Sequence, residues 1–161
     1  MPSPDLKTAA DVSNYLLDIT GRAMMSGDFE TFRSCFHLPQ KLETFDGTRE
    51  RRTPDELRQT FEPVRIHYRR QGVTQLVRDC VSAEFKGDDE VHATHQAFLL
   101  AGTELRQQPF PGFSILKRVD GDWKITFSQY AITDTPDHNR ALSGEIAEPT
   151  TTFNAETSDN G

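Results

Sequence analysis

The chain has 161 residues, and its 18 Lys and Arg against 25 Asp and Glu give a formal net charge of -7 at pH 7. This length favours one domain whose core is large enough to fold without metals or disulfides. The acidic balance argues against a nucleic-acid partner, because phosphate contacts need a basic face. Cys35 and Cys80 make no disulfide framework. Since the sequence shows neither a signal-peptide pattern nor an apolar run near the roughly 20 residues of a membrane span, we expect a soluble, cytoplasmic protein without a membrane partner.

Two helices and a short strand are predicted first in chain order. After an N-terminal extension of residues 1–10, Asp11 can cap a helix that ends at Gly27. Asp28 then opens a short second helix that Pro39 stops, and residues 40–45 are long enough for one strand. The apolar positions of the two helices follow helical spacing: Val12, Tyr15, Leu16, Ile19 and Ala23 in the first, and Phe29, Phe32 and Phe36 in the second.

A third helix has the clearest start signal in the chain, at residues 53–56. Thr53 at the cap, Pro54 at the first helical position and Glu56 three residues after the cap form a capping box. We expect this helix to end at Gly72, with a kink or a break at Pro63. Its predicted buried stripe is Leu57, Phe61, Val64 and Tyr68.

Four consecutive strands in two hairpins are predicted between Val73 and Thr133. A first turn centred on Asp88 joins two runs of alternating residues. This register places Val81 opposite His95 and Asp79 opposite Ala97. Because side chains alternate between the two faces of a strand, Asp79 and His95 then share the apolar core face.

The second predicted hairpin has the turn Asp120-Gly121-Asp122, which sets Val119 opposite Trp123. The opposite face, with Ser114, Leu116 and Tyr130, is half polar, as expected of a surface that meets water or a partner. The predicted core-facing residues, besides Lys117, are Phe113, Ile115, Val119, Trp123, Ile125, Phe127 and Gln129.

The composition changes after Ile132 to residues rich in Thr, Asn, Asp, Glu and Pro. Such a segment cannot bury enough apolar area to offset its ordering entropy. We therefore expect a domain of residues 11–133 and a flexible acidic and polar tail of residues 134–161, and we expect truncation after Thr133 to leave the domain folded.

The order helix, helix, short strand, helix and four long strands resembles the NTF2-like superfamily and, more narrowly, its SnoaL-like polyketide cyclase relatives. The resemblance covers about residues 10–133, and its motifs lie at residues 27–32, 46–47, 53–57, 87–88 and 121–125. It implies an α+β fold in which three N-terminal helices pack on a strongly bent, mainly antiparallel sheet that forms a cone with a pocket inside. It also implies frequent homodimers. Because the superfamily contains isomerases, dehydratases, epoxide hydrolases, cyclases and non-catalytic binding modules, the fold alone does not give the function.

Asp79 and His95 are the catalytic candidates. An aspartate that holds one imidazole nitrogen would raise the basicity of the ring and orient it as a general base. Two alternatives stay open: the pair satisfies only itself, or a slip in register puts one member outside. Gln129 is a candidate for orienting a carbonyl or hydroxyl of a ligand, and the alternative is a core glutamine bonded to the backbone.

Further pocket candidates are two histidines and three aromatic residues. His67 at the edge of the third helix's apolar stripe and His37 beside Pro39 are candidates for the pocket mouth, although His37 can instead cap helical carbonyls. His92 and His95 lie on opposite faces of a strand and cannot chelate one metal, so no metal and no cofactor is predicted. The expected apolar lining includes Phe113, Trp123 and Phe127.

The sequence departs from the catalytic members of the superfamily. Dehydratases of this fold use a Tyr and an Asp from the first helical region and a His early in the first long strand, and residues 20–26 and 76–77 lack them. The sequence also lacks an evident Asp-Arg-Asp set like that of the epoxide hydrolases, because the neighbours Arg78 and Asp79 face opposite ways.

Two hypotheses follow for the function. In the first, the protein binds a small, largely apolar or aromatic molecule in the cone, with isomerase, cyclase or lyase acid-base chemistry as its catalytic version. In the second, it is a non-catalytic, dimerising association module. In either case we expect a homodimer through the outer sheet face, since an exposed apolar patch usually marks a contact. The predicted patch is Phe98, Leu100, Leu116, Tyr130 and Ile132.

Overall fold

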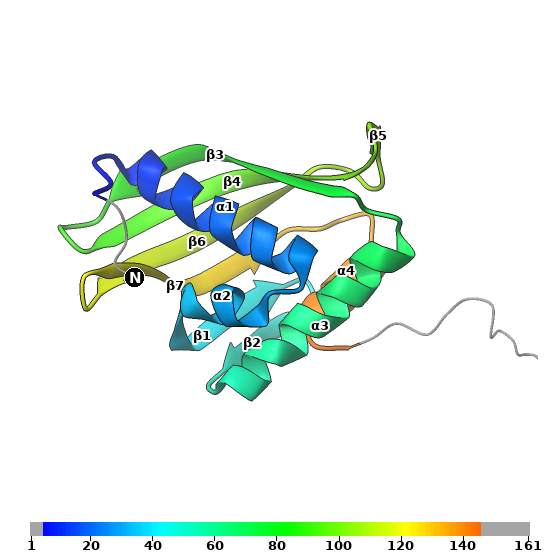
Figure 1. Ribbon diagram of the computed structural model, residues 1–161, viewed down its shortest axis with the longest axis horizontal. Helices are drawn as coiled ribbons and strands as arrows, with labels where there is room; N and C mark the ends of the chain where they lie inside the picture. Colours follow the sequence, from blue (N-terminus) through cyan, green and yellow to red (C-terminus); the bar gives the residue numbers. More distant parts are fainter. Residues whose placement is uncertain (1–4, 146–161) are drawn as a thin grey trace, which may run out of the picture.

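The computed structural model describes residues 5–145 as four helices that pack on one curled sheet (Figure 1). The helices are α1 (Ala9–Ser26), α2 (Phe29–Ser34), α3 (Pro54–Arg70) and α4 (Pro136–Leu142). The strands are β1 (Phe36–Thr44), β2 (Gly47–Arg51), β3 (Gln75–Phe85), β4 (Glu90–Ala101), β5 (Glu104–Leu105), β6 (Phe110–Val119) and β7 (Asp122–Tyr130).

The sheet has the strand order β2-β1-β7-β6-β4-β3, and the short β5 pairs with β4. Every pairing is antiparallel except that between β1 and β7. Helix α1 runs along the inner face of the sheet, and α3 and α4 lie together at one end (Figure 1). This arrangement confirms the predicted α+β cone with a mainly antiparallel sheet.

Helix α1 begins before its predicted cap. The Thr8 hydroxyl accepts a hydrogen bond from the Asp11 backbone N–H at 3.0 Å, and the Asp11 carboxylate accepts one from the Thr8 N–H at 3.2 Å. Asp11 is therefore the third residue of a capping box whose cap is Thr8. The domain start predicted at residue 11 is too late, whereas the predicted end at Gly27, with a φ of 82°, is correct.

Helix α3 starts at its predicted cap, where the Thr53 hydroxyl accepts a hydrogen bond from the Glu56 N–H at 3.1 Å. The Glu56 carboxylate accepts from the Arg52 N–H instead of closing the box on Thr53. No break occurs at Pro63, because the helix continues to Arg70 with its stripe packed into the core, and such packing supplies most helical stability. The stripe Leu57, Phe61, Val64 and Tyr68 is buried as predicted.

A bulge in β3 overturns the predicted position of Asp79. Near the turn the register is as predicted, with Ala83 opposite Ala93. The register then shifts between Cys80 and Ser82, so that Cys80 lies opposite His95 and Arg78 opposite Ala97. One extra residue moves every preceding side chain to the other face. Asp79 is consequently exposed. Arg78 takes the inward position that was predicted for Asp79.

The second hairpin differs from prediction because its turn has two residues instead of three. Val119 pairs with Asp122, and Asp120 and Gly121 both have positive φ, at 52° and 86°. Positive φ at both central residues is typical of a type I′ hairpin turn. Relative to the prediction β6 moves by one position, so Ser114 and Leu116 line the cone while Phe113 and Ile115 face outward.

A second bulge, in β7, turns the side chains at the end of that strand to the opposite face of the sheet. Leu116 pairs with Ile125 but Ile115 pairs with Phe127, which leaves Thr126 as the extra residue. Trp123 and Ile125, before the bulge, are buried as predicted. Beyond the bulge, Ser128 and Tyr130 line the cone. The prediction that Phe127 and Gln129 face the core is therefore wrong.

Helix α4 continues the domain beyond the predicted boundary at residue 133. The Thr60 hydroxyl donates to the Leu142 carbonyl at 2.9 Å, and the Asn139 amide donates to the Ile132 carbonyl at 3.0 Å. Ala141 and Leu142 are buried in the core cluster that contains Phe61 and Val64. The prediction of a flexible tail over residues 134–161 is wrong for α4. Residues 146–161 of the predicted tail lie outside the described residues. Thr135-Pro136-Asp137 repeats the order cap, Pro, Asp of the α3 start, so a signal was present.

Truncation after Thr133 should therefore destabilise the domain, because it uncovers the apolar side chains of α3 that α4 buries. Relative to a chain that ends at Glu145, we expect a loss of at least about 3 kcal/mol in the free energy of unfolding, comparable to one large core deletion. Urea unfolding of the two truncated chains measures the difference. Equal midpoints would show that α4 adds nothing to the fold.

Candidate functional site

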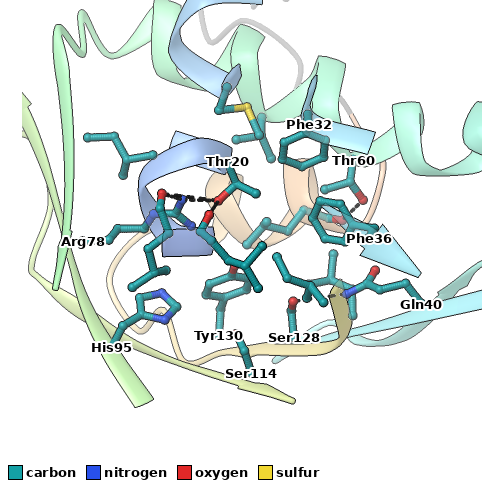
Figure 2. Close-up of a pocket in the computed structure, with 18 of the residues that line it drawn as sticks. Thr20, Phe32, Phe36, Gln40, Thr60, Arg78, His95, Ser114, Ser128 and Tyr130 are labelled. Carbon is teal, nitrogen blue, oxygen red and sulfur yellow. Dashed lines mark hydrogen bonds between the residues drawn. The ribbon is translucent and has the colours of Figure 1, made fainter. Parts of the chain in front are cut away.

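A cavity lies inside the cone, between the inner face of the sheet and helices α1, α3 and α4 (Figure 2). The space available to the centres of water molecules is about 80 Å³, and one water needs roughly 10–15 Å³ by this measure, so several waters or a small organic molecule fit. Most of the wall is aliphatic or aromatic. The polar side chains that reach it are Ser13, Thr20, Gln40, Thr60, Tyr68, Arg78, His95, Ser114, Ser128, Tyr130 and His138.

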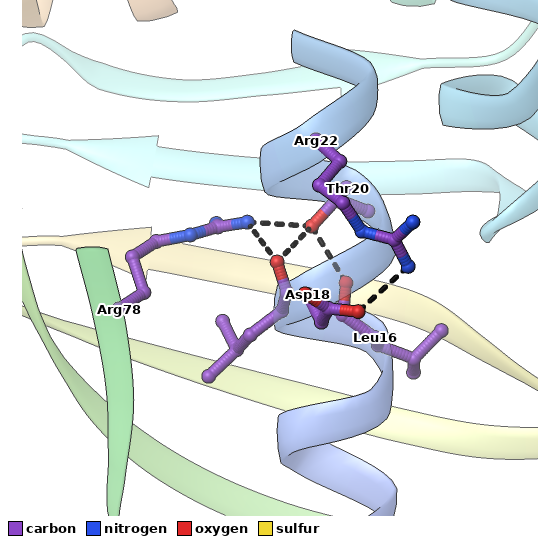
Figure 3. Close-up of polar contacts among 6 residues, drawn as sticks. Leu16, Asp18, Thr20, Arg22 and Arg78 are labelled. Atoms are coloured by element: carbon purple, nitrogen blue, oxygen red, sulfur yellow. Dashed lines mark hydrogen bonds and ion pairs between the residues drawn. The ribbon is translucent and has the colours of Figure 1, made fainter. Parts of the chain in front are cut away.

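Arg78 supplies the permanent positive charge of the cavity. Its Nη2 donates to the Leu17 carbonyl at 2.8 Å and to the Thr20 hydroxyl at 2.6 Å (Figure 3). Thr20 in turn donates to the Leu16 carbonyl at 2.7 Å, so its oxygen is oriented to accept from Arg78. A Cβ at Gly21 would lie 3.3 Å from Nη2, so glycine lets α1 approach the guanidinium closely. These contacts fix the guanidinium against α1.

His95 lies beside this group and is 2% exposed. Its Nε2 is buried and has no hydrogen-bond partner among the described residues. A Cβ on Gly112 would lie 2.4 Å from the His95 ring, so the imidazole occupies space that only glycine leaves open. Burial, with the positive charge of Arg78 as the smaller cause, lowers the pKa of His95 to about 3. The ring is therefore neutral near pH 7.

A second polar cluster lies where α3 and α4 meet. The Gln107 amide nitrogen lies 3.1 Å from His138 Nδ1, and His138 Nε2 lies 3.3 Å from the Tyr68 hydroxyl. Each ring nitrogen of His138 thus has a hydrogen-bonding partner, the Gln107 amide at Nδ1 and the Tyr68 hydroxyl at Nε2. His67 stacks on His138 with ring centroids 4.9 Å apart. Burial lowers the pKa of both histidines, and His67 lowers that of His138 further.

Of the site residues predicted from sequence, only His95 lines the cavity. Asp79 is exposed and does not face His95. Gln129 is exposed and donates to Glu43 at 2.8 Å. Phe113 and Phe127 contact each other on the outer face of the sheet. His37 is exposed, and His67 and Trp123 are buried in the core away from the cavity wall.

The polar residues that sequence reasoning missed are Arg78, Thr20, Tyr130, Tyr68 and His138. Arg78 and Tyr130 were assigned to the outer face because neither bulge was predicted. Thr20 and Tyr68 carried detectable signals, since Tyr68 belongs to the predicted stripe of α3 and Thr20 lies four residues after Leu16 on α1. His138 was missed with α4.

Residues 5–145 contain neither a cluster of metal ligands nor a helix suited to span a membrane. No group of three His, Cys, Asp or Glu side chains in this range comes together in a way that would hold a metal ion. Within the same range, no helix has the length and apolar character that crossing a bilayer requires.

Comparison with solved structures identifies the architecture. An NTF2-like protein of unknown function from Shewanella oneidensis superposes with a TM-score of 0.59 at 14% identity, over 75% of this chain and 97% of that one. The protein has the NTF2-like fold. A proposed dehydratase of the NTF2-like family from Streptomyces avermitilis gives a TM-score of 0.59 at 14% identity, over 78% of this chain and 96% of that one.

A proposed aromatic ring hydroxylase from Novosphingobium aromaticivorans matches less closely, with a TM-score of 0.55 at 12% identity over 79% of this chain and 90% of that one. At these identities the likeness of this NTF2-like chain to its neighbours shows the fold alone. No protein-family model matches the sequence, and no curated protein matches it either. The narrower SnoaL-like resemblance stays a prediction.

The buried histidines predict how the stability of this NTF2-like domain depends on pH. His67, His95 and His138 have a pKa below 6.5 when folded, so the unfolded chain binds more protons as the pH falls below 6.5. Stability is therefore complete above pH 6.5 and declines as the pH drops, for His95 down to a pH of about 3. Each histidine contributes up to about 1.4 kcal/mol per pH unit.

Urea unfolding at pH 7 and pH 5 measures this decline. A His95→Gln variant lacks one of the three groups, so its free energy of unfolding should fall less steeply than that of the wild type by up to about 1.4 kcal/mol per pH unit. Parallel pH profiles for the two proteins would contradict a neutral, buried His95.

Proposed function

We propose that the protein binds a small, largely apolar or aromatic molecule inside the cone. We also propose that it is located in the cytoplasm. The observation that carries the binding proposal is the cavity itself, which has a mainly apolar wall with a few converging polar groups. Small-molecule sites have this make-up.

Binding is favoured over acid-base catalysis by the groups around His95. The side chains that line the cavity include no Asp and no Glu among the described residues. An imidazole whose pKa is about 3 is a weak base, and an efficient general base needs a pKa near the working pH. Because Asp79 lies outside the cavity, the predicted Asp79–His95 catalytic pair does not form, and His95 is a neutral polar group of the wall.

A variant that fills the cavity tests this proposal. Ser114→Leu places a larger apolar side chain into the cone, so binding of a small aromatic probe such as benzoate or toluene should fall at least tenfold, while the free volume limits the loss of stability. Ser82→Leu, on an exposed serine of β3, is the matched control. Ligand-observed NMR measures the binding. Undiminished binding to Ser114→Leu would place the probe outside the cone.

We also propose a homodimer through the outer face of the sheet, the second candidate role. The patch differs from the predicted one, because Leu116, Tyr130 and Ile132 point into the core or the cone. Its apolar members, to which we refer as the outer patch, are the half-buried Phe98, Leu100, Phe113, Ile115 and Phe127. Phe113 and Phe127 pack edge to face with centroids 6.2 Å apart. In a closed twofold dimer this patch meets its own copy.

Light scattering at micromolar concentration tests the dimer. Phe113→Asp introduces a charge into the outer patch and should convert the dimer to a monomer, since an unpaired charge is costly to bury. Phe45→Asp is the control, because Phe45 is 64% exposed and lies beyond the patch, at the β1–β2 turn. A wild-type protein that is already monomeric would refute the proposal.

A further inference from the structure

We infer that the ligand of the cone is an apolar or aromatic monocarboxylic acid whose carboxylate is held by Arg78. This inference rests on the proposed function, since it names the chemical class of the molecule that the cavity accepts. It begins from the position of one cation in a cavity wall that contains no carboxylate among the described residues.

The charge of Arg78 has no partner inside the described protein. Within the described residues its side chain donates two hydrogen bonds, both from Nη2 to neutral oxygens, those of Leu17 and Thr20. The ion pairs found within residues 5–145 do not include Arg78. Neutral acceptors orient the guanidinium but carry no charge that balances its own, so an anion in the cavity would be its counter-ion.

Arg51 shows what a structural arginine looks like in the same fold. It is 5% exposed and also has no carboxylate partner in the described residues, yet all three of its nitrogens donate. Nε donates to Thr60, Nη1 to Gln59 and Nη2 to the Leu142 carbonyl at the C-terminal end of α4, where a cation is favoured. Arg78, by contrast, leaves Nε and Nη1 without a protein acceptor in the described chain. These two nitrogens are the donors available to a ligand.

The field of Arg78 extends through the site. Its charge helps to lower the pKa of His95, and it opposes the rise in the pKa of Tyr68 that burial causes. Both side chains line the cavity with Arg78. Figure 2 shows His95 on the same side of the cavity as Arg78. A negatively charged group placed among these residues would be attracted by a cation in surroundings of low polarity, where charge-assisted hydrogen bonds from arginine are strongest.

The number of charges selects a carboxylate over a phosphate. Arg78 is the one cationic side chain of the described cavity wall, because His95 and His138 are neutral at pH 7. One negative charge balances it, whereas a dianion would leave a net charge within the apolar wall. With Nη2 bonded to Leu17 and Thr20, either Nε or Nη1 of Arg78 can donate one charge-assisted hydrogen bond to the carboxylate. The apolar remainder of the ligand then contacts aliphatic and aromatic side chains such as Leu76, Phe110 and Tyr130.

The experiment compares benzoate with benzamide, two probes of nearly equal shape that differ in charge. Isothermal titration at pH 7.5 on the wild-type protein should show benzoate binding at least tenfold more tightly than benzamide, and more tightly than the dianion phenyl phosphate. The preference for benzoate should shrink as salt concentration rises, because ions screen the interaction.

Two variants assign the preference to its residue. Arg78→Met removes the charge and should bring the benzoate to benzamide ratio close to one, and Arg78→Lys, which keeps the charge, should retain part of the preference. The matched control is Arg22→Met, because Arg22 lies on α1 with a side chain 73% exposed and pairs with Asp18 at 2.7 Å (Figure 3). It should bind like the wild type.

The outcomes separate the two proposals. Equal binding of benzoate and benzamide to the wild type, or a preference that survives in Arg78→Met, would overturn the carboxylate assignment and leave the small-molecule cone in place. If benzoate, benzamide and toluene all fail to bind, the proposed function falls and the carboxylate assignment falls with it.

Discussion

The single extra residue in β3 is the constraint on which the chemistry of the cone depends. Because the register with β4 shifts between Cys80 and Ser82, Arg78 turns inward and Asp79 turns to solvent. Without the bulge the cavity would contain an aspartate beside His95, and the arginine would lie outside. Bulges often lie next to functional sites, where they redirect a side chain. Here the bulge decides the sign of the charge inside the cone.

The bulge also determines how the helical layer meets the sheet. With Arg78 pointing inward, its Nη2 reaches the Leu17 carbonyl and the Thr20 hydroxyl in the middle of α1. Gly21 leaves room for this approach on the same helix. A charged side chain of the sheet therefore ties α1 across the cavity, and the same contact that joins the two layers holds the guanidinium in one orientation. The hydrogen bonds of Arg78 to Leu17 and Thr20 thus stabilise the fold and also orient the charged group of the site.

The sequence predicted the elements far better than it predicted their faces. The end of α1 at Gly27 and the start of α3 at Thr53 were correct, because caps and helix-ending glycines are encoded by a few neighbouring residues. The facing of β3 and β7 was only half correct, since Cys80-Val81-Ser82 and Ile125-Thr126-Phe127 continue the alternation without a glycine to mark the bulges. The position of a bulge depends on how the helices and the sheet pack together. The sequence of a single strand does not contain this information.

The electrostatics of the site follow from that one change of register. An aspartate facing His95 would have stabilised the imidazolium and raised the pKa of His95, as a general base requires. Arg78 acts in the opposite direction and adds to the effect of burial, so the imidazole stays neutral and the guanidinium remains the charge of the cavity. A neutral imidazole adds no charge to the cavity wall, so the charge that a ligand meets there is that of Arg78. The same strand β3 would thus support proton abstraction in one register, and in the register that the protein adopts it favours anion recognition.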